Sequence, residues 1–404
     1  MFEHRHFRLK LSVTSALAGA LATVCGLAGC GGNGSSSGDA SASASASASA
    51  STTTAWTLPG GFPAPAVPAD NPMSAAKVDL GRFLFYDKRL SGNGTQACAS
   101  CHFQDKAFTD GLAVSRGSTG EFTARNAQAL GNVAYSPTLT WANPSLVVLE
   151  RQMEVPLFGE NPVEMGITDR NKAAVLQRFA DAALYAPKFA AAYPGDANPV
   201  NWGNIINAIA TFQRSLISGN SKYDQAIADK ALFSGAEQRG KDLFFGDKAV
   251  CVQCHQGFNF NDQVIVASSQ AVKKPFHNIG LYNVGGSGAY PEPNRGVMEL
   301  SGLYQDMGAF RAPSLRNVEV TAPYMHDGSI ATLEEVLDII AEGGRNIASG
   351  ANAGDGRQNP YKSQLARPLA LTAQDKADLI AFLKTLTDPD FLGNPLQSDP
   401  FKLP

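Results

Sequence analysis

The stretches Cys98-Ala-Ser-Cys101-His102 and Cys251-Val-Gln-Cys254-His255 determine which fold this chain adopts. Each stretch places two thiols three positions apart and follows the second thiol directly with an imidazole. In c-type cytochromes this CxxCH spacing lets both thiols bind one porphyrin covalently while the histidine binds its iron. We therefore predict two covalently attached c-type haems, with His102 and His255 as the iron ligands.

Two other uses of paired cysteines fit the sequence less well. A zinc site built from four thiolates needs both pairs close together, whereas these pairs begin at positions 98 and 251 and each carries its own histidine. Disulfides within each pair would suit an exported protein, but they leave His102 and His255 without a role. Haem attachment is the interpretation that uses all six side chains.

Similar segments precede the two motifs. The first is Leu80-Gly-Arg-Phe-Leu-Phe-Tyr-Asp87, and the second is Arg239-Gly-Lys-Asp-Leu-Phe-Phe-Gly246. Both have the pattern of an amphipathic helix that ends in aromatic residues, as the first helix of a cytochrome c domain does. An internal duplication explains the likeness. We predict a mostly α-helical protein of two cytochrome c-like domains, residues 59–232 and 233–404, each with one covalently bound haem.

Other segments show the 3.6-residue period of helices. We expect helices over residues 173–192, 205–217, 332–342 and 372–385. Thr332 and Thr372 have the side chains of N-caps at the starts of the last two. Strand signals are sparse, and 39 glycines with 23 prolines indicate long ordered loops. The 33 basic and 36 acidic residues nearly balance, so no nucleic acid partner is expected.

The N-terminal residues have the composition of a targeting segment rather than a domain. Residues 1–30 combine a basic start with an apolar stretch and end in Leu27-Ala-Gly-Cys30, which resembles a bacterial lipoprotein cleavage box. Residues 31–58 form a low-complexity tether. We predict a periplasmic lipoprotein anchored through Cys30, with the outer membrane as the expected location. A plain transmembrane anchor, or a signal cleaved elsewhere, is the alternative.

Four further motifs are long enough to be specific. They are Arg125-Asn126 ahead of Asn132-Val-Ala-Tyr135, Asn161-Pro-Val-Glu-Met165, Arg311-Ala-Pro-Ser-Leu-Arg-Asn317 and Thr321-Ala-Pro-Tyr-Met-His-Asp-Gly328. With these motifs the chain resembles the bacterial di-haem cytochrome c peroxidase and MauG superfamily from about Ala75 to Thr387. Segments such as Pro275-Phe-His-Asn278 look most like the MbnH-type branch, whose members use peroxide to oxidise tryptophan on a partner protein.

The resemblance assigns the peroxide-reacting haem to His102. Conventional peroxidases of this group carry a further histidine that blocks the iron until the other haem is reduced, yet residues 103–132 contain no histidine. This departure implies an iron open to peroxide without prior reduction. The resemblance also implies that Gln152, Pro156 and Glu164 form the active-site trio. An isolated glutamate is usually a solvated surface charge, but a carboxylate above the iron can carry a proton between the two peroxide oxygens.

The same resemblance implies roles for residues between the two haems. Trp141 matches a tryptophan that relays electrons, although packing in the core is the other reading. A calcium ion is expected at the Asn126 side chain and the carbonyls of Thr321 and Pro323, because oxygen donors suit a hard cation. The guanidinium groups of Arg311 and Arg316 are expected to pair with haem propionates.

The second haem is where the pattern departs from the family. Relatives place a Met or Tyr ligand fourteen positions after the histidine of the TAPYxHDG motif, and here Ile340 occupies that position. Met298, Met307 or a water molecule could substitute, and the choice stays open. His277 and His326 stand in motifs that relatives share without using them as ligands, so we do not predict them to bind iron.

These features predict a di-haem peroxidase-like oxidoreductase. It is expected to react with hydrogen peroxide at the His102 haem and to use the second haem to oxidise a secreted partner protein, for example at a tryptophan. Peroxide detoxification with electrons from a small cytochrome or cupredoxin is the alternative. A non-catalytic di-haem electron carrier is a third reading, but it would fill both axial positions of both irons, and the missing histidine and Glu164 argue against it.

Overall fold

The computed structural model describes residues 58–402. The predicted signal segment, the anchor at Cys30 and all but the last residue of the predicted tether lie outside the described residues. Within residues 58–402, none of the helices combines the length and apolar character that a membrane crossing requires.

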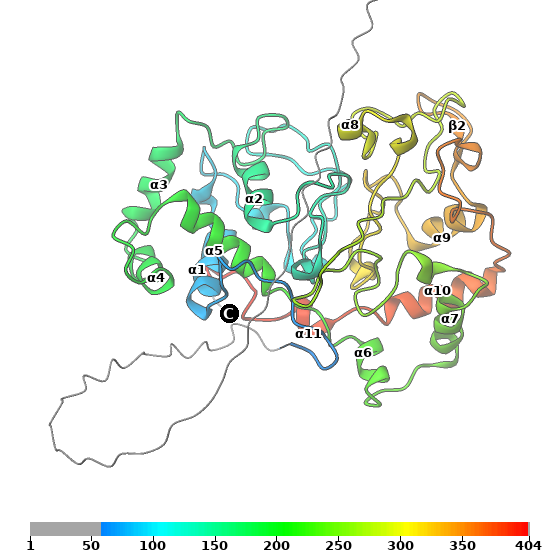
Figure 1. Ribbon diagram of the computed structural model, residues 1–404, viewed down its shortest axis with the longest axis horizontal. Helices are drawn as coiled ribbons and strands as arrows, with labels where there is room; N and C mark the ends of the chain where they lie inside the picture. The colour runs from blue at the N-terminus through cyan, green and yellow to red at the C-terminus, as the bar shows by residue number, and fades with distance from the viewer. Residues whose placement is uncertain (1–57, 403–404) are drawn as a thin grey trace, which may run out of the picture. The chain divides into compact units, whose positions relative to one another are not determined.

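The described part of the chain is mostly helical, which confirms the predicted fold class at that level (Figure 1). The α-helices are α1 (Ala75–Tyr86), α2 (Leu149–Phe158), α3 (Lys172–Ala180), α4 (Tyr185–Ala192), α5 (Trp202–Arg214), α6 (Lys222–Ile227), α7 (Gly235–Phe245), α8 (Met298–Ser301), α9 (Leu333–Glu342), α10 (Ala373–Lys384) and α11 (Pro389–Leu392).

Short 3-10 helices and one small sheet complete the regular structure. The 3-10 helices are η1 (Lys88–Leu90), η2 (Cys98–Ser100), η3 (Gln104–Lys106), η4 (Val133–Tyr135), η5 (Cys251–Gln253), η6 (Tyr304–Asp306), η7 (Val318–Val320) and η8 (Gly356–Gln358). The sheet pairs β1 (Asn346–Ile347) with β2 (Gly354–Asp355) in antiparallel fashion. Long loops connect these elements, as the glycine and proline content predicts.

The first hydrophobic core forms where α1 crosses α5 (Figure 1). Leu80, Leu84 and Phe85 of α1 are fully buried in this core. At Gly81 the two backbones touch, because a Cβ atom there would overlap the carbonyl of Ala208. Only glycine permits so close a crossing without displacing a helix.

The second core repeats this arrangement with α7 and α10 (Figure 1). A Cβ atom at Gly240 of α7 would overlap the carbonyl of Asp378 in α10. Phe244 and Phe382 are buried beside that crossing. Gly81 and Gly240 occupy matching places before the two CxxCH motifs, which is what an internal duplication predicts.

The predicted helices form with two differences in their bounds. Thr332 and Thr372 are N-caps as predicted, since their hydroxyl groups accept backbone N–H groups at 3.2 and 3.1 Å. The helix predicted over 173–192 is wrong as one element, because the chain breaks between α3 and α4. Pro187 explains the break: it lacks the N–H that a continuous helix would need at that position. The helix predicted from 205 starts earlier, at the N-cap Asn201.

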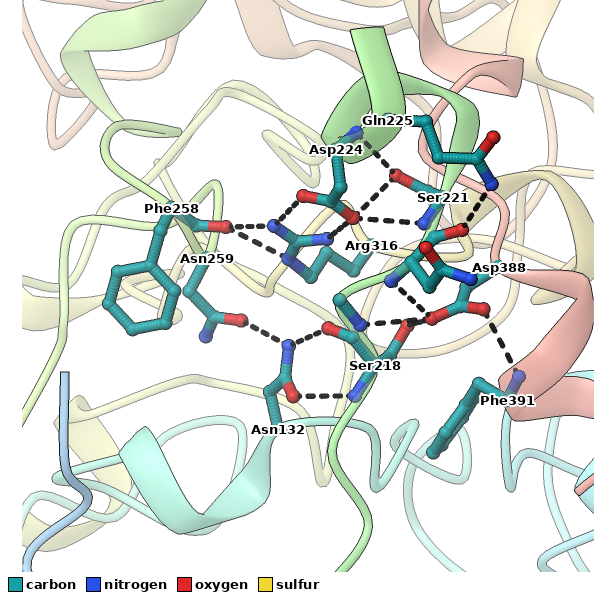
Figure 2. A network of polar contacts seen from close by, with 12 residues as sticks. Asn132, Ser218, Ser221, Asp224, Gln225, Phe258, Asn259, Arg316, Asp388 and Phe391 are labelled. Carbon is teal, nitrogen blue, oxygen red and sulfur yellow. Dashed lines mark hydrogen bonds and ion pairs between the residues drawn. The ribbon is translucent and has the colours of Figure 1, made fainter. Parts of the chain in front are cut away.

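A buried polar network joins segments on both sides of the predicted domain boundary (Figure 2). Asn132 donates to the Ser218 carbonyl and accepts from its N–H, both at 2.9 Å. The carboxylate of Asp388 accepts from the Ser218 hydroxyl at 3.1 Å, and Asn317 accepts from the Asp388 N–H at 2.8 Å. Hydrogen bonds therefore cross from residues before 232 to residues after 233, and the division into two domains stays a prediction.

Candidate functional site

The first CxxCH motif is built as a ligand-presenting turn. Cys98 opens η2, and the N–H of Cys101 donates to the Cys98 carbonyl at 3.1 Å. The next residue, His102, has its Nδ1 2.6 Å from the carbonyl of Phe108. This bond selects the tautomer with a free Nε2, as histidine ligands of metals usually require. Burial lowers the pKa of His102, so its imidazole stays neutral and can bind iron.

The second CxxCH motif repeats the construction. Cys251 opens η5, and the N–H of His255 donates to the Cys251 carbonyl at 2.9 Å. The Nδ1 atom of His255 lies 3.0 Å from the carbonyl of Phe260. Burial again lowers the pKa of this histidine. Both imidazoles are thus oriented by a backbone carbonyl five or six residues downstream, with Nε2 available for a metal.

The four cysteines of these motifs are free thiols. None of the cysteines in residues 58–402 forms a disulfide. Burial raises the pKa of Cys98 and Cys251 to about 12. The same cause raises the pKa of Cys101 and Cys254 to about 11. The disulfide alternative is therefore not found, and reduced thiols are the form that adds to porphyrin vinyl groups.

The surroundings of the second motif fit a haem. A cavity of about 270 Å³ lies against Cys251, Cys254 and His255. Its remaining wall is mainly hydrocarbon and aromatic, with contributions from Phe244, Leu315, Val318, Leu333, Val336, Leu337, Ile340, Leu379 and Leu383. Attachment groups on one wall and apolar side chains on the others are what a covalently held porphyrin requires.

The three residues predicted for the peroxide site lie on neighbouring segments of the chain. Gln152 and Pro156 stand four positions apart in α2 and so share one face of that helix. The N–H of Met165 donates to the Pro156 carbonyl at 3.0 Å, which places Glu164 beside the end of α2. Proline inside a helix removes a backbone hydrogen bond, here the bond that position 156 would donate to the Gln152 carbonyl.

Glu164 lies close to the first attachment motif. Burial raises the pKa of the Glu164 carboxyl, and no other group contributes. Burial is the main reason why the pKa values of Cys98 and Cys101 are raised, and the negative charge of Glu164 raises both of them further. The backbone carbonyl of Glu164 also accepts from the N–H of Ser118 at 2.7 Å, which holds its loop. The carboxyl is thus a partly buried titratable group near the thiols that precede His102, and its role as a proton carrier stays a prediction.

Trp141 is a buried residue in the wall of the second haem cavity. Its indole N–H donates to the carbonyl of Asn126 at 2.9 Å, and its own carbonyl accepts from the N–H of Arg311 at 3.0 Å. The ring therefore has a fixed position between a loop of the first half of the chain and the pocket of His255.

The predicted calcium positions lie in two loops that are distant in the sequence and joined by a hydrogen bond. The N–H of Asn126 donates to the carbonyl of His326 at 2.9 Å, which ties it to the loop containing Thr321 and Pro323. The Asn126 side chain donates to the Leu112 carbonyl at 2.7 Å, so its Oδ1 is directed elsewhere. Within residues 58–402, no hydrogen bond reaches that Oδ1 or the carbonyls of Thr321 and Pro323.

The two predicted propionate partners differ in their surroundings. Arg311 lines the cavity, and burial lowers its pKa to about 10. Arg316 is instead held by Asp224 through two bonds of 2.8 and 2.9 Å, and it also donates to the Phe258 carbonyl (Figure 2). Arg311 has partners as well, since it donates to the Gln128 side chain and to the Thr138 carbonyl, both at 3.0 Å. Both roles stay predictions.

The sequence leaves the second axial ligand of the His255 haem open. Met298 and Met307 do not line the cavity, whereas Ile340 does. His277 and His326 also line it, together with Met325, which sequence reasoning did not single out. The signal for Met325 was available, because it stands directly before the histidine of the TAPYxHDG motif.

Comparisons with known proteins agree with this geometry. Residues 75–231 match the family described as di-haem cytochrome c peroxidase. The chain is 36% identical to cytochrome-c peroxidase IdrP1 of Denitromonas iodatirespirans, over 85% of this chain and 89% of that protein. It is 32% identical to the methylamine utilization protein MauG of Methylorubrum extorquens, over 79% and 80%.

One solved structure is similar to this chain over nearly the full length of the solved chain. It is the crystal structure of a MauG-like protein associated with microbial copper homeostasis, which is 56% identical to this chain. The TM-score is 0.85, and the match covers 86% of this chain and 99% of that one.

Proposed function

Because the chain belongs to the di-haem cytochrome c peroxidase and MauG family, we propose that it uses hydrogen peroxide to oxidise a partner protein. Family membership implies two c-type haems and a peroxidase or related oxidoreductase activity. The finer assignment is ours: peroxide reacts at the His102 haem, and the oxidising equivalents reach the partner through the His255 haem. The observation that carries this proposal is the partly buried carboxyl of Glu164 beside the first CxxCH motif, whose pKa is raised by that burial.

The residues around His102 divide the work of peroxide cleavage. When bound, the haem supplies a redox-active iron that accepts the oxidising equivalents of peroxide. Glu164 takes a proton from one peroxide oxygen and returns it to the other, a role that its raised pKa favours at neutral pH. Gln152 donates from its amide to orient the peroxide. Pro156 narrows the pocket and limits the entry of water.

Trp141 connects the two centres in this proposal. Its indole is large and oxidisable, and the bond to Asn126 fixes it against the cavity of His255. A cation held by Asn126, Thr321 and Pro323 would sit in the same loop junction. Such a cation would stabilise the Asn126 backbone that receives the indole N–H, so calcium would act on electron transfer by holding Trp141 in place.

The similar proteins support oxidation of a protein substrate as the first candidate and detoxification as the second. The solved structure that is 56% identical to this chain is a MauG-like protein associated with copper homeostasis, and MauG itself is among the relatives. Detoxification remains the second candidate, because a cytochrome-c peroxidase is 36% identical to this chain. In either case we propose a periplasmic enzyme held at the outer membrane through Cys30, with hydrogen peroxide as the oxidant.

The two candidates predict different products. The purified two-haem enzyme would be mixed with peroxide and a secreted protein encoded beside it, and separately with a reduced small cytochrome or cupredoxin. A protein oxidant should add oxygen to a tryptophan or tyrosine of the partner, seen by peptide mass spectrometry only when enzyme and peroxide are both present. Rapid oxidation of the reduced cytochrome, with an unmodified partner, would establish detoxification instead.

A further inference from the structure

Tyr304 differs from the other tyrosines of the chain in its exposure. All ten tyrosines lie within residues 58–402, and Tyr304 is the only exposed one, with 66% of its surface accessible to solvent. It belongs to η6, and the nearby side chains of Leu300 and Leu303 are exposed as well. A phenol in this position can release its proton to water when it is oxidised, and another molecule can reach its ring. Tyr304 is therefore placed for one-electron chemistry at the surface.

The ring of Tyr304 is stacked on a second tyrosine. Its centroid lies 6.4 Å from that of Tyr361, and the two planes are 28° apart. Aromatic pairs at this separation are in contact. Tyr361 is half-buried, and it packs against the cluster of buried residues that contains Tyr282 and Tyr290. Tyr361 thus lies between an exposed tyrosine and two buried ones.

Hydrogen bonds hold Tyr361 against the segment that carries the buried tyrosines. The side-chain amide of Asn359 donates to the carbonyl of Tyr282 at 2.7 Å and to that of Gly288 at 3.1 Å. The side-chain oxygen of Asn359 accepts from the N–H of Tyr361 at 2.8 Å. A Cβ atom at Gly288 would lie 2.5 Å from the Tyr361 ring, so the ring packs directly on that backbone. Since Gly288 stands two residues before Tyr290, the three tyrosines of this region have fixed relative positions.

Tyr290 is the buried end of this series, because it lines the cavity of His255. Its ring meets the ring of Tyr282 edge to face, with centroids 5.4 Å apart. The hydroxyl of Tyr282 donates to the carboxylate of Asp327 at 2.6 Å. A carboxylate can accept the phenol proton while Tyr282 is oxidised and return it when Tyr282 is reduced again. Tyr282 can therefore pass an electron without losing its proton to solvent.

We propose that these four tyrosines form a relay that carries oxidising equivalents from the cavity of His255 to the surface, and that Tyr304 at its end is a site of covalent modification. The inference rests on the proposed function, which supplies hydrogen peroxide as the oxidant and a haem at the second CxxCH motif. When no partner protein consumes the oxidising equivalents, Tyr304 is oxidised instead, and two copies of the chain become joined through it.

The chemistry of this coupling balances. The Tyr304 phenol of each copy loses one electron and one proton, which leaves a phenoxyl radical. The two radicals form a carbon–carbon bond between their ortho positions, and the two ortho hydrogens move to the oxygens and restore both phenols. The two electrons and two protons reduce one hydrogen peroxide molecule to two water molecules.

Peroxide in the absence of any partner tests the proposal. The two-haem enzyme is mixed with hydrogen peroxide, and the products are separated by denaturing gel electrophoresis and mapped by peptide mass spectrometry. We expect a covalent dimer with dityrosine fluorescence, in which two peptides containing residue 304 are joined with the loss of two hydrogen atoms. A dimer joined at other residues, or no dimer while peroxide is consumed, would overturn the proposal.

Single substitutions separate the relay from general oxidative damage. Tyr304→Phe keeps the stacked ring but removes the oxidisable phenol, and it should abolish the dimer without lowering the unfolding temperature. Tyr361→Phe should lower the dimer yield and the tyrosyl radical signal in electron paramagnetic resonance, although Tyr304 itself is intact. Tyr223→Phe is the matched control, at a half-buried tyrosine outside the cavity wall, and should behave like the parent. An undiminished dimer in Tyr304→Phe would exclude the site, and an undiminished dimer in Tyr361→Phe would exclude the relay.

Peroxide consumption separates this outcome from the proposed function. It is measured in the same samples, together with the change in the Soret band. If the parent consumes peroxide but Tyr304 stays unmodified, the relay alone fails. If the parent does not react with peroxide, the proposed function fails and the relay fails with it.

Discussion

Replacement of Glu164 by glutamine is the sharpest perturbation of the peroxide site. The change keeps the volume of the side chain and its capacity for hydrogen bonding but removes its titratable proton. Burial is the only cause that raises the pKa of Glu164, so no ion pair is broken by the substitution. We therefore expect a chemical effect without a structural one. His102 and its bond to the Phe108 carbonyl are untouched.

The magnitude follows from the role of the carboxyl. A positioned acid–base group contributes about 10²–10⁴-fold to a rate, so the peroxide reaction of Glu164→Gln should slow by that factor. In the parent, the reaction needs the carboxylate form first, so its rate should rise with pH through a pKa above the usual 4.5. The variant should lose this pH dependence.

The thermal stability of Glu164→Gln should not fall, in contrast to its rate of reaction with peroxide. Because the folded-state pKa of Glu164 is raised, the fold favours the protonated carboxyl, and its contribution to stability is lost as pH rises through that pKa. A neutral glutamine avoids the free-energy cost of holding an ionised carboxylate at this partly buried position. The unfolding temperature of Glu164→Gln should equal or exceed that of the parent at pH 7.

Stopped-flow absorbance after mixing with peroxide measures the rate across pH. Glu160→Gln is the matched control, since Glu160 lies four residues earlier in the same loop and is exposed. That control should react like the parent. If Glu164→Gln also reacts at the parental rate, the carboxyl does not carry the proton and the trio must be reassigned.

Three further predictions address the rest of the molecule. Trp141→Phe keeps an aromatic ring but loses the indole and its bond to Asn126; peroxide should still react at the first centre, while partner oxidation falls sharply, and unchanged partner oxidation would remove Trp141 from the path. Gly240→Ala forces a Cβ atom onto the Asp378 carbonyl and should cost about 1–3 kcal/mol or more in thermal unfolding, whereas Gly302→Ala, with open space around it, should lose much less despite its positive φ. Calcium removal by chelation should slow partner oxidation reversibly, and Asn126→Ala should weaken calcium binding measured by calorimetry; an unaltered calcium affinity would refute the assigned site.

Local signals in the sequence predicted local features well. The hydroxyl side chains of Thr332 and Thr372 stand before apolar helical stretches, and both are N-caps. The two CxxCH motifs specify a turn whose geometry depends on adjacent residues only. The likeness of the segments around Gly81 and Gly240 predicted a matching helix in each half of the chain, and both glycines lie at helix crossings.

Features that depend on distant contacts could not be predicted. Arg316 reaches Asp224, which lies 92 positions earlier, and nothing in either local sequence indicates that pair. The carbonyl that orients His102 belongs to Phe108, whose φ of +65° is set by packing rather than by its residue type. The place of Met325 in the cavity wall likewise depends on the path of a whole loop.

The proposed function depends above all on a His102 haem that is open to peroxide in the fully oxidised enzyme. Electron paramagnetic resonance of that enzyme, followed by stopped-flow mixing with peroxide in the absence of any reductant, tests this most directly. We expect a high-spin ferric signal and an immediate change in the Soret band. Low-spin signals from both haems, with no reaction until one electron is added, would contradict it.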